Sequence, residues 1–365
     1  MADENLPAPL PPPAALDDVV TLRDFEPLAR ARMRRPAFEY YAGGAWDEAT
    51  LAGNEAAFER YRLRPRVLVD VSNVDTSTTL LGRRVALPVG IAPAALHGLA
   101  HPLGELATAR AAAAAGALFC LSTVSSRSIE AVAEAVPNGP RWFQLYVRRD
   151  RAFGRELVKR AAAAGYEALV VTVDLPVLGY RDRDRRMRFD PGPDAYGNLP
   201  AREGFAGNFD DLLDMRSVGL TWDHMAEIRS WSSLPLVLKG VMTAEDAHLA
   251  VEHGAAGVWV SNHGGRQLDR VPAPIDVLAD VVAAVGGRAE VYVDGGFRRG
   301  PDVLIGLALG ARAVFTARPF LYALAAAGEA GVAHAFGIVR EELERAMALL
   351  GTPTVAEVNR SCLAS

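Results

Sequence analysis

The stretch SNHGGRQLD at residues 261–269 places two chemically useful side chains close together. His263 and Arg266 are separated only by two glycines, and they follow GVWV (257–260), which has the composition of a buried strand. An imidazole exchanges protons near neutral pH, and a guanidinium presents a fork of donors that matches a carboxylate. Taken alone, however, His263 would more often be a strand-end histidine that caps backbone carbonyls.

Other polar side chains stand at the ends of β-rich runs along the chain. One polar residue in such a place carries little information, but seven of these runs share the feature. Parallel strands of a barrel all present their carboxyl ends on one face, where barrel enzymes build their active sites. We therefore expect one site that contains Ser122, Gln144, Tyr146, Thr172, Asp174, Lys239, Ser261, His263, Asp294 and Arg318.

The elements that position these residues are short β-rich runs alternating with alanine-rich helical stretches. Eight runs fit strands, at 85–93, 118–123, 141–147, 168–174, 234–241, 257–263, 290–296 and 313–319. Helical stretches such as 104–116, 244–254 and 300–310 each end in a glycine, as helix C-termini often do. Apolar strands that alternate with helices indicate a parallel sheet covered on both faces. The sequence therefore predicts an α/β fold, a (β/α)8 TIM barrel, with an open doubly wound sheet as the alternative.

Three segments fall outside this repeat. Residues 1–18 are rich in proline and lack periodicity, which predicts a disordered tail. Residues 19–84 contain a helical pattern at 26–44 and predict an N-terminal helical extension. The stretch 175–220 is too long for an ordinary βα loop, so we expect an insert after the fourth strand that acts as a lid or binding loop. Residues 19–365 are expected to form a single domain.

Composition narrows the classes of function. A net charge of −5 with scattered charges gives no basic face for nucleic acid or anionic lipid. No apolar stretch approaches the roughly 20 residues that cross a bilayer, so no membrane span is expected. Two cysteines, Cys120 and Cys362, cannot form a disulfide framework and favour a reducing, cytoplasmic location. No cluster of His, Cys, Asp or Glu has ligand spacing, so no metal site is predicted.

Two loops near the C-terminus have the character of a phosphate site. DGGFRRG (294–300) combines Gly295 and Gly296, which let a ligand approach the backbone, with Arg298 at the start of a predicted helix. TARPF (316–320) adds Arg318. Loops after strands seven and eight are the usual phosphate site of such barrels, so the position strengthens the prediction.

The motifs, in their order along the chain, resemble those of the FMN-dependent 2-hydroxy-acid oxidase and dehydrogenase family. The match runs from about residue 20 to the C-terminus and includes YYAGGAWDEATLAGNEAAFER, IAPAALHGLAHPLGE, WFQLYV, VTVDLPVLGYRDRD, LVLKGV, SNHGGRQLD and DGGFRRGPDV. The resemblance implies FMN as the cofactor, a small 2-hydroxy acid as the substrate and a homotetrameric assembly.

The resemblance also implies catalytic roles for four residues. His263 would take a proton from the substrate's C2 centre, and Asp174 would orient the imidazole and stabilise its protonated form. Tyr146 would hydrogen-bond the reacting hydroxyl. Lys239 would lie beside flavin N1 and O2, where a fixed cation stabilises negative charge on the ring.

Binding roles follow from the same resemblance. Arg266, Tyr40 and Arg181 would hold the substrate carboxylate. The cofactor would be held by Ala94, Ser122, Gln144, Thr172, Lys239, Ser261, Asp294, Gly295, Gly296, Arg298, Ala317 and Arg318. Among the remaining histidines only His97, after the first strand, is a candidate for touching substrate.

Three positions depart from the family pattern. Ala317 stands where many members have glycine, so the phosphate loop must accept one extra methyl group. Val124 occupies a position that is tryptophan in the glycolate oxidases of the family, and Leu96 replaces a methionine or alanine. Val124 and Leu96 are expected to line the substrate pocket, which predicts an apolar pocket for a side chain larger than that of glycolate, such as the phenyl group of mandelate.

The sequence therefore predicts an FMN-dependent (S)-2-hydroxy-acid oxidase that forms a 2-oxo acid and passes the electrons to O2, giving H2O2. L-Lactate as the substrate, or a dye or quinone as the acceptor, is the alternative within the family. A barrel aldolase that forms a Schiff base at Lys239 is an alternative from another enzyme class. A flavin-binding barrel without turnover is disfavoured, because a binding module has no use for a buried base.

Overall fold

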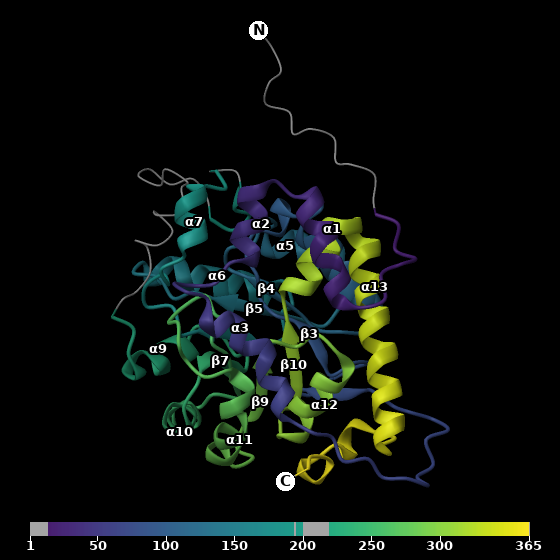
Figure 1. Ribbon diagram of the computed structural model, residues 1–365. Coiled ribbons are helices and arrows are strands. Elements are labelled where there is room, and N and C mark those ends of the chain that lie inside the picture. The colour runs from purple at the N-terminus through teal and green to yellow at the C-terminus, as the bar shows by residue number, and fades with distance from the viewer. Residues whose placement is uncertain (1–13, 193–194, 200–218, 365) are drawn as a thin grey trace.

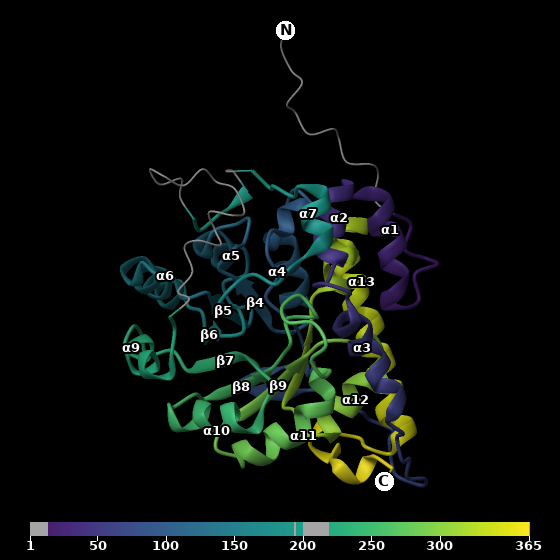
Figure 2. The same cartoon turned by 60° about the vertical axis from the view of Figure 1, so that its left-hand side comes forward.

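The computed structural model describes residues 14–192, 195–199 and 219–364. These residues fold into a closed barrel of parallel strands with helices around it (Figures 1 and 2). Around the barrel the strand order is β10-β3-β4-β5-β6-β7-β8-β9. This closed topology confirms the predicted (β/α)8 barrel and excludes an open doubly wound sheet. The strands are β3 (Val89–Ile91), β4 (Phe119–Ser122), β5 (Arg141–Leu145), β6 (Leu169–Thr172), β7 (Leu236–Val241), β8 (Gly257–Val260), β9 (Glu290–Asp294) and β10 (Ala313–Thr316).

Helices follow the strands and cover the outside of the barrel (Figure 2). They are α4 (Glu105–Ala114), α5 (Ile129–Ala135), α6 (Arg151–Ala163), α9 (Met225–Arg229), α10 (Ala244–Glu252), α11 (Pro274–Val285), α12 (Gly300–Ala308) and α13 (Arg318–Leu350). The glycines expected to end α4, α10 and α12 have φ values of +65°, +79° and +105° at Gly116, Gly254 and Gly310. A residue with a Cβ adopts this left-handed conformation at a cost, so the sequence signal reflects a real backbone requirement.

The predicted N-terminal extension is helical, as expected. It contains α1 (Phe25–Arg32), α2 (Arg35–Ala42) and α3 (Ala49–Ala56). Pro36 lies in the first turn of α2, and because proline has no N–H, α1 cannot continue through it. The insert after β6 begins with α7 (Asp182–Met187), which packs against α2; the remainder of the predicted lid at 193–194 and 200–218 lies outside the described residues.

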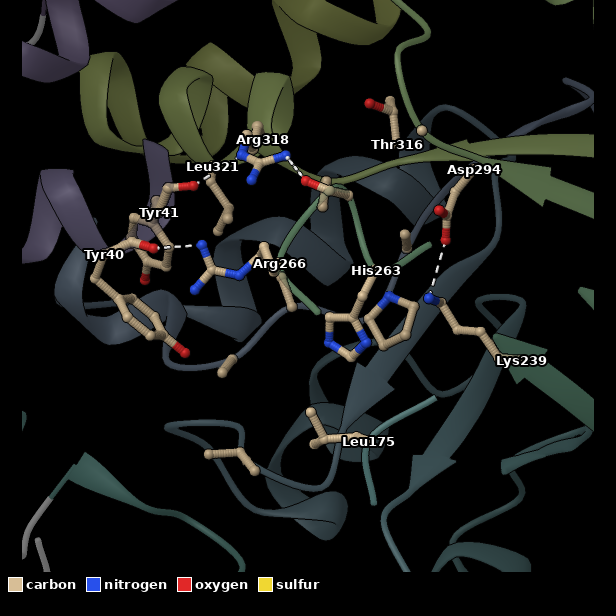
Figure 3. A pocket seen from close by; sticks show the side chains of 18 of the residues that line it. Tyr40, Tyr41, Leu175, Lys239, His263, Arg266, Asp294, Thr316, Arg318 and Leu321 are labelled. Atoms are coloured by element: carbon tan, nitrogen blue, oxygen red, sulfur yellow. Dashed lines mark hydrogen bonds and ion pairs between the residues drawn. The ribbon is translucent and has the colours of Figure 1, made fainter. Parts of the chain in front are cut away.

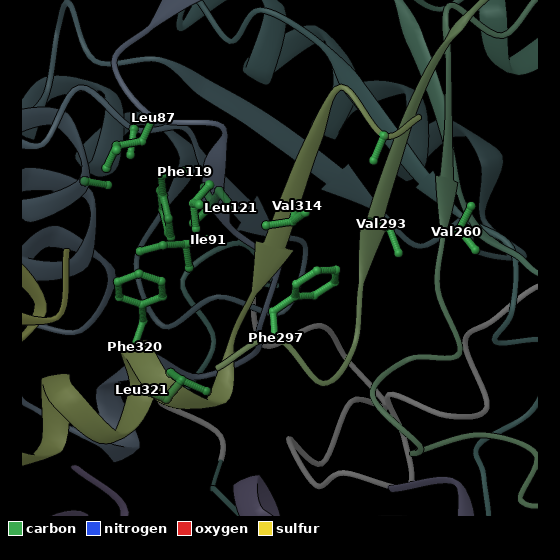
Figure 4. Close-up of a cluster of buried hydrophobic side chains, with 14 of the residues drawn as sticks. Leu87, Ile91, Phe119, Leu121, Val260, Val293, Phe297, Val314, Phe320 and Leu321 are labelled. Atoms are coloured by element: carbon green, nitrogen blue, oxygen red, sulfur yellow. The ribbon is translucent and has the colours of Figure 1, made fainter. Parts of the chain in front are cut away.

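The core has two layers separated by the barrel wall. Inside the barrel, the side chains of Trp142, Trp259, Tyr292 and Phe315 pack together, and none of them is exposed. On the outside, strand side chains pack against the helices; Figure 4 shows Ile91, Phe119 and Leu121 near Phe320 of α13. Because both faces of each strand are buried, the strands have the near-continuous apolar sequences from which a parallel sheet was predicted.

One predicted strand, 85–93, is wrong in its extent. Only Val89–Ile91 belongs to the barrel as β3, while Val85 ends β2 (Arg83–Val85), which pairs antiparallel with β1 (Thr78–Leu80). Pro88 lies between the two strands and cannot donate to a ladder hydrogen bond, which explains the interruption. Leu80 and Val85 pack with the interior aromatic residues, so this hairpin closes the end of the barrel opposite the carboxyl ends of the strands.

Two other expectations need adjustment. No helix long and apolar enough to cross a membrane was expected from the sequence, but α13 meets both criteria. Because 67% of its most apolar stretch is buried inside the protein, α13 is buried to the extent typical of a core helix. Of the predicted tail, residues 1–13 lie outside the described part of the chain, whereas Ala14 donates its N–H to Ala326 O and packs on α13.

Candidate active site

A cavity lies at the carboxyl ends of the barrel strands, where the sequence places its polar residues (Figure 3). It brings together residues from the N-terminal extension, the carboxyl ends of all eight barrel strands and the first turn of α13. The predicted residues that line it are Tyr40, Ala94, Val124, Tyr146, Arg181, Lys239, His263, Arg266, Asp294, Gly295, Gly296, Arg298, Ala317 and Arg318.

The imidazole of His263 lies between a carboxylate and a phenol. Its Nδ1 is 2.9 Å from Asp174 Oδ1, and its Nε2 is 3.3 Å from the hydroxyl oxygen of Tyr146. An ionised carboxylate only accepts hydrogen bonds, so Nδ1 carries the proton, and the unprotonated Nε2 accepts the hydrogen bond from the Tyr146 hydroxyl. The arrangement therefore supplies a base at Nε2, in the cavity, with a carboxylate behind it to stabilise the protonated ring.

The charge states of His263 and Asp174 also favour a base at His263 Nε2. Burial lowers the pKa of His263 below its usual value, although the Asp174 carboxylate opposes the shift. Burial alone would raise the pKa of Asp174, but the adjacent His263 holds that pKa below its usual value. At neutral pH the histidine is therefore neutral and able to accept a proton, while the aspartate is ionised.

The remaining polar residues of the 261–269 motif tie it to its surroundings. The amides of Asn262 and Asn54 exchange two hydrogen bonds of 2.7 and 3.0 Å, which fix α3 against the motif. Gln267 donates to the carbonyl oxygens of Asp174 and Val177. Because these two hydrogen bonds of Gln267 fix the backbone at Asp174, they hold the Asp174 carboxylate in position beside His263.

His263 itself has a φ of +59°, an uncommon conformation for a non-glycine residue that is often found at functional sites.

The two glycines between His263 and Arg266 allow protein neighbours to come close. A Cβ on Gly264 would lie 2.9 Å from Arg318 Nη1, and one on Gly265 would lie 2.7 Å from Leu51 N. Both glycines also have positive φ values, +66° and +73°, and Gly264 lines the cavity as well. Glycine at these two positions is therefore favoured by the backbone conformation and by the close neighbours.

The end of α2 organises the predicted carboxylate anchor. Arg266 Nη1 donates to Tyr40 O and Gly43 O, each at 2.7 Å, so the guanidinium lies at the negative end of this helix. The guanidinium carbon of Arg266, Cζ, is 4.9 Å from the centre of the Tyr40 ring. Arg181 donates from Nε to Arg266 O, and burial lowers the pKa of Arg181 to about 10, which leaves it charged at neutral pH. The buried Arg181, the partly buried Arg266 and Tyr40 thus line one part of the cavity.

A second group of buried polar residues forms hydrogen-bond chains across consecutive strands. Lys239 Nζ is 2.8 Å from Ser261 Oγ and 3.0 Å from Asp294 Oδ2, and Ser261 Oγ donates to the other oxygen of Asp294. Ser122, Gln144 and Thr172 form a similar chain on β4, β5 and β6. The serines, Gln144 and Thr172 do not line the cavity themselves; they lie beneath its surface, with 5% or less of each exposed.

The loops after β9 and β10 have the features that bind a phosphate. Gly295 and Gly296 have φ values of +100° and +87°, and a Cβ on Gly296 would lie 2.0 Å from Asn54 O. Arg298 is held by Glu55 at 2.7 Å, and Arg318 begins α13. Arg318 donates to Tyr41 O, Gly43 O and Gly264 O. Backbone N–H groups at the start of a long helix, beside two arginines, suit a dianion.

These donors fit FMN. The loops with Gly296, Arg298 and Arg318 can hold its phosphate, while Lys239, which lines the cavity and is bonded to the buried polar residues beneath it, can place a cation beside the ring edge. Ala317, the departure from the family pattern, has a φ of −118°, so its methyl group causes no backbone strain. The described residues contain no group of His, Cys, Asp or Glu able to hold a metal ion.

One predicted pocket residue is wrong. The side chain of Leu96 is fully buried and does not line the cavity, because its backbone turns with a φ of +59° and directs the side chain into the core. Its carbonyl accepts a hydrogen bond from the Tyr41 hydroxyl. The side chain of His97, the other candidate, does not line the cavity either. Its Nδ1 forms a hydrogen bond with the Thr108 hydroxyl, and burial lowers the pKa of His97 to about 3. Val124 does line the cavity, as predicted.

Several cavity residues escaped sequence reasoning, among them Arg148, Leu175, Leu178 and Leu199. Arg148 follows Tyr146 by two positions, so the alternation of side chains along a strand end could have identified it. Leu175 and Leu178 follow Asp174 directly in a motif already selected. Leu199 lies far along the insert, and nothing in its local sequence marks it.

The aldolase alternative finds no support in the surroundings of Lys239. A lysine that forms a Schiff base must present a neutral amine to its substrate. The Lys239 ammonium is instead paired with Asp294 and bonded to Ser261, and only 4% of the residue is exposed.

Comparisons with known proteins agree with this geometry. Residues 29–365 match the family model described as FMN-dependent dehydrogenase. The chain is 47% identical to L-lactate oxidase of Nostoc sp. over 96% of this chain and 99% of that one, and 46% identical to glycolate oxidase of Spinacia oleracea over 95% and 96%. A crystal structure of mandelate oxidase with (S)-4-hydroxymandelic acid superposes with a TM-score of 0.89 at 43% identity, covering 94% of this chain and 98% of the other.

Proposed function

Because the chain belongs to the FMN-dependent dehydrogenase family and resembles 2-hydroxy-acid oxidases over almost its full length, we propose that it oxidises an (S)-2-hydroxy acid to the 2-oxo acid, with O2 reduced to H2O2. The observation that carries the proposal is the base His263 Nε2, backed by Asp174, in one cavity with the carboxylate-binding Arg266. FMN, when bound, supplies the two-electron acceptor.

The side chains of this protein would bind, orient and deprotonate the substrate. Arg266 and Arg181, with Tyr40, hold the carboxylate and so fix the substrate's C2 centre. Tyr146 binds the hydroxyl on C2. His263 Nε2 then takes a proton from this centre, and the ionised Asp174 stabilises the resulting imidazolium.

The first test is the reaction of the FMN-loaded protein with a panel of 2-hydroxy acids. Under nitrogen we expect the substrate to bleach the flavin absorbance, and in air we expect one H2O2 for each 2-oxo acid formed. If only an added quinone or dye restored the absorbance, the protein would be a dehydrogenase. If no acid bleached it, the proposed activity itself would be wrong.

We also propose that the substrate has an apolar side chain larger than that of glycolate, such as the phenyl group of mandelate. The apolar side chains of Val124, Leu175 and Leu178 line the same cavity as Tyr146 and so favour an apolar group on the substrate. Each buried methylene contributes about 0.8 kcal/mol, which favours a phenyl ring over a hydrogen atom or a methyl group.

Val124→Trp tests this pocket assignment. An indole at this position would fill space beside the substrate, so kcat/KM for (S)-mandelate should fall at least about tenfold relative to kcat/KM for glycolate, since apolar pockets discriminate single methylenes by that factor or more. Steady-state kinetics with (S)-mandelate, (S)-2-hydroxyoctanoate, L-lactate and glycolate gives the ranking. A wild type that prefers glycolate or lactate, or an unchanged ranking in the variant, would contradict the assignment.

A further inference from the structure

We propose that Leu199, a residue of the insert after β6, helps to determine how large a substrate side chain the enzyme accepts, and that Asn198 positions it. This inference rests on the proposed function and deepens it. Leu199 lines the same cavity as Val124 and His263 and is only 4% exposed, so it forms part of the wall and not of the outer surface.

Asn198 holds this part of the insert against the barrel. The residue is 2% exposed, and both ends of its amide are used. Its Oδ1 accepts from Ile129 N at 2.9 Å and from Arg160 Nη2 at 3.3 Å, and its Nδ2 donates to Ser125 Oγ at 2.9 Å. Ile129 is the first residue of α5, so its backbone N–H has no acceptor within the helix. A buried amide with these partners resists displacement, because moving it would leave several buried polar groups unpaired.

The neighbouring glycine shows how closely the segment approaches. Gly197 donates its N–H to Ser125 O at 2.8 Å. A Cβ on Gly197 would lie 2.3 Å from the carbonyl carbon of Arg127, and no side chain fits in that space. Residues 195–199 therefore form a strap, meaning a segment laid directly on the loop between β4 and α5 and fixed there by backbone and side-chain bonds.

The strap is fixed to the same loop that carries Val124. Ser125, which receives both strap bonds, is the next residue after Val124. Leu199 and Val124 consequently belong to one bonded unit, although 75 positions of sequence numbering separate them. Both side chains line the cavity, so a shift of the strap relative to this loop would change the space left for substrate. We therefore expect Leu199 to limit the room that a side chain as small as that of Val124 leaves in the cavity.

Replacing Leu199 should change which substrates are preferred. For Leu199→Ala we expect the ratio of kcat/KM for (S)-mandelate to kcat/KM for L-lactate to rise at least about tenfold, and for Leu199→Phe we expect it to fall, because one methylene in an apolar pocket changes discrimination by about 10- to 200-fold. Leu349→Ala is a matched control, since Leu349 is 78% exposed on α13 and far from the cavity; its ratio should equal that of the wild type.

The positioning role of Asn198 has its own test. Asn198→Ala and Ser125→Ala each remove the bond between the strap and the loop, so each should shift the ratio at least threefold in the direction of Leu199→Ala. Because the two residues share that bond, the double variant should shift the ratio no further than Asn198→Ala alone. A purely structural role would lower kcat/KM for both substrates equally and leave the ratio unchanged.

Binding measurements separate this inference from the proposed activity. (S)-2-Phenylpropionate lacks the hydroxyl and cannot be oxidised, so calorimetry on the FMN-loaded protein reports pocket shape without turnover. Its affinity relative to propionate should rise in Leu199→Ala. If the relative affinity and the kcat/KM ratio both stayed within threefold of wild type in Leu199→Ala, the inference would be wrong while the oxidase activity stood. If the wild type oxidised no 2-hydroxy acid, the proposed function would fail first.

Discussion

His263→Ala should lower the rate of 2-oxo acid formation by about 10²- to 10⁴-fold while leaving FMN binding intact. Removal of a positioned general base has an effect of this size. The loss follows from the geometry, because the unprotonated Nε2 of His263 is at the cavity with the Asp174 carboxylate behind the ring, and among the described residues that line this cavity His263 is the only histidine. The side chain does not belong to the loops that fit the phosphate, so the cofactor should stay bound.

The measurement is single-turnover bleaching of the flavin absorbance by substrate under nitrogen. His248→Ala is a suitable control, because His248 lies on α10 with its side chain 57% exposed. The control should behave as wild type. A His263→Ala protein that loads FMN and is bleached at a rate near that of wild type would remove His263 from the mechanism.

The pH profile of the wild type provides an independent check on the same residue. The base must be neutral to accept a proton, and burial places the pKa of His263 below the usual value of about 6.5. Activity should therefore be retained as the pH falls through 6.5 and should decline only when the ring becomes protonated at lower pH. A decline of kcat/KM that begins well above pH 6.5 would contradict the neutral, desolvated histidine.

Much of this site could be predicted from the sequence because its residues follow strand ends. A strand, a turn and a helix are each encoded locally, and the barrel brings all of its strand ends to one face. Tyr146, Lys239, His263 and Asp294 were therefore placed correctly by position alone. The Asp174–His263 pair was implied by family resemblance, and the structure shows the two side chains 2.9 Å apart.

What could not be predicted depends on contacts between distant segments. The direction of the Leu96 side chain is decided by a left-handed backbone turn, and no property of leucine announces that turn. Leu199 lines the cavity from a segment in which the neighbouring Asn198 bonds to the loop after β4. The glycines at 264 and 265 are required by Arg318 and Leu51, which are remote in the sequence. Such tertiary approaches leave no periodic signal in the chain.

Arg266→Lys should lower kcat/KM by about ten- to a hundredfold, mainly through a higher KM, and should also slow flavin bleaching at saturating substrate. Hydrogen bonds to a charged group contribute about 1.5–3 kcal/mol, and a lysine cannot supply them in the planar fork that a carboxylate matches. Arg266 also uses Nη1 to hold Tyr40 O and Gly43 O at the end of α2, as well as lining the cavity. The three donors of one ammonium cannot bond both carbonyls and also present a planar pair of donors to the substrate carboxylate.

The slower bleaching follows from this competition. A lysine drawn toward the carbonyls of α2 would let the carboxylate shift, and a shift of about 1 Å at the reacting centre can lower the rate by about a hundredfold. Arg270→Lys is the matched control, because Arg270 forms an exposed pair with Asp47 outside the cavity, and it should leave both constants unchanged. If both Arg266→Lys and Arg270→Lys kept the KM of the wild type, Arg266 would not be the carboxylate anchor. Arg181 and Tyr40 would then have to hold the substrate carboxylate without it.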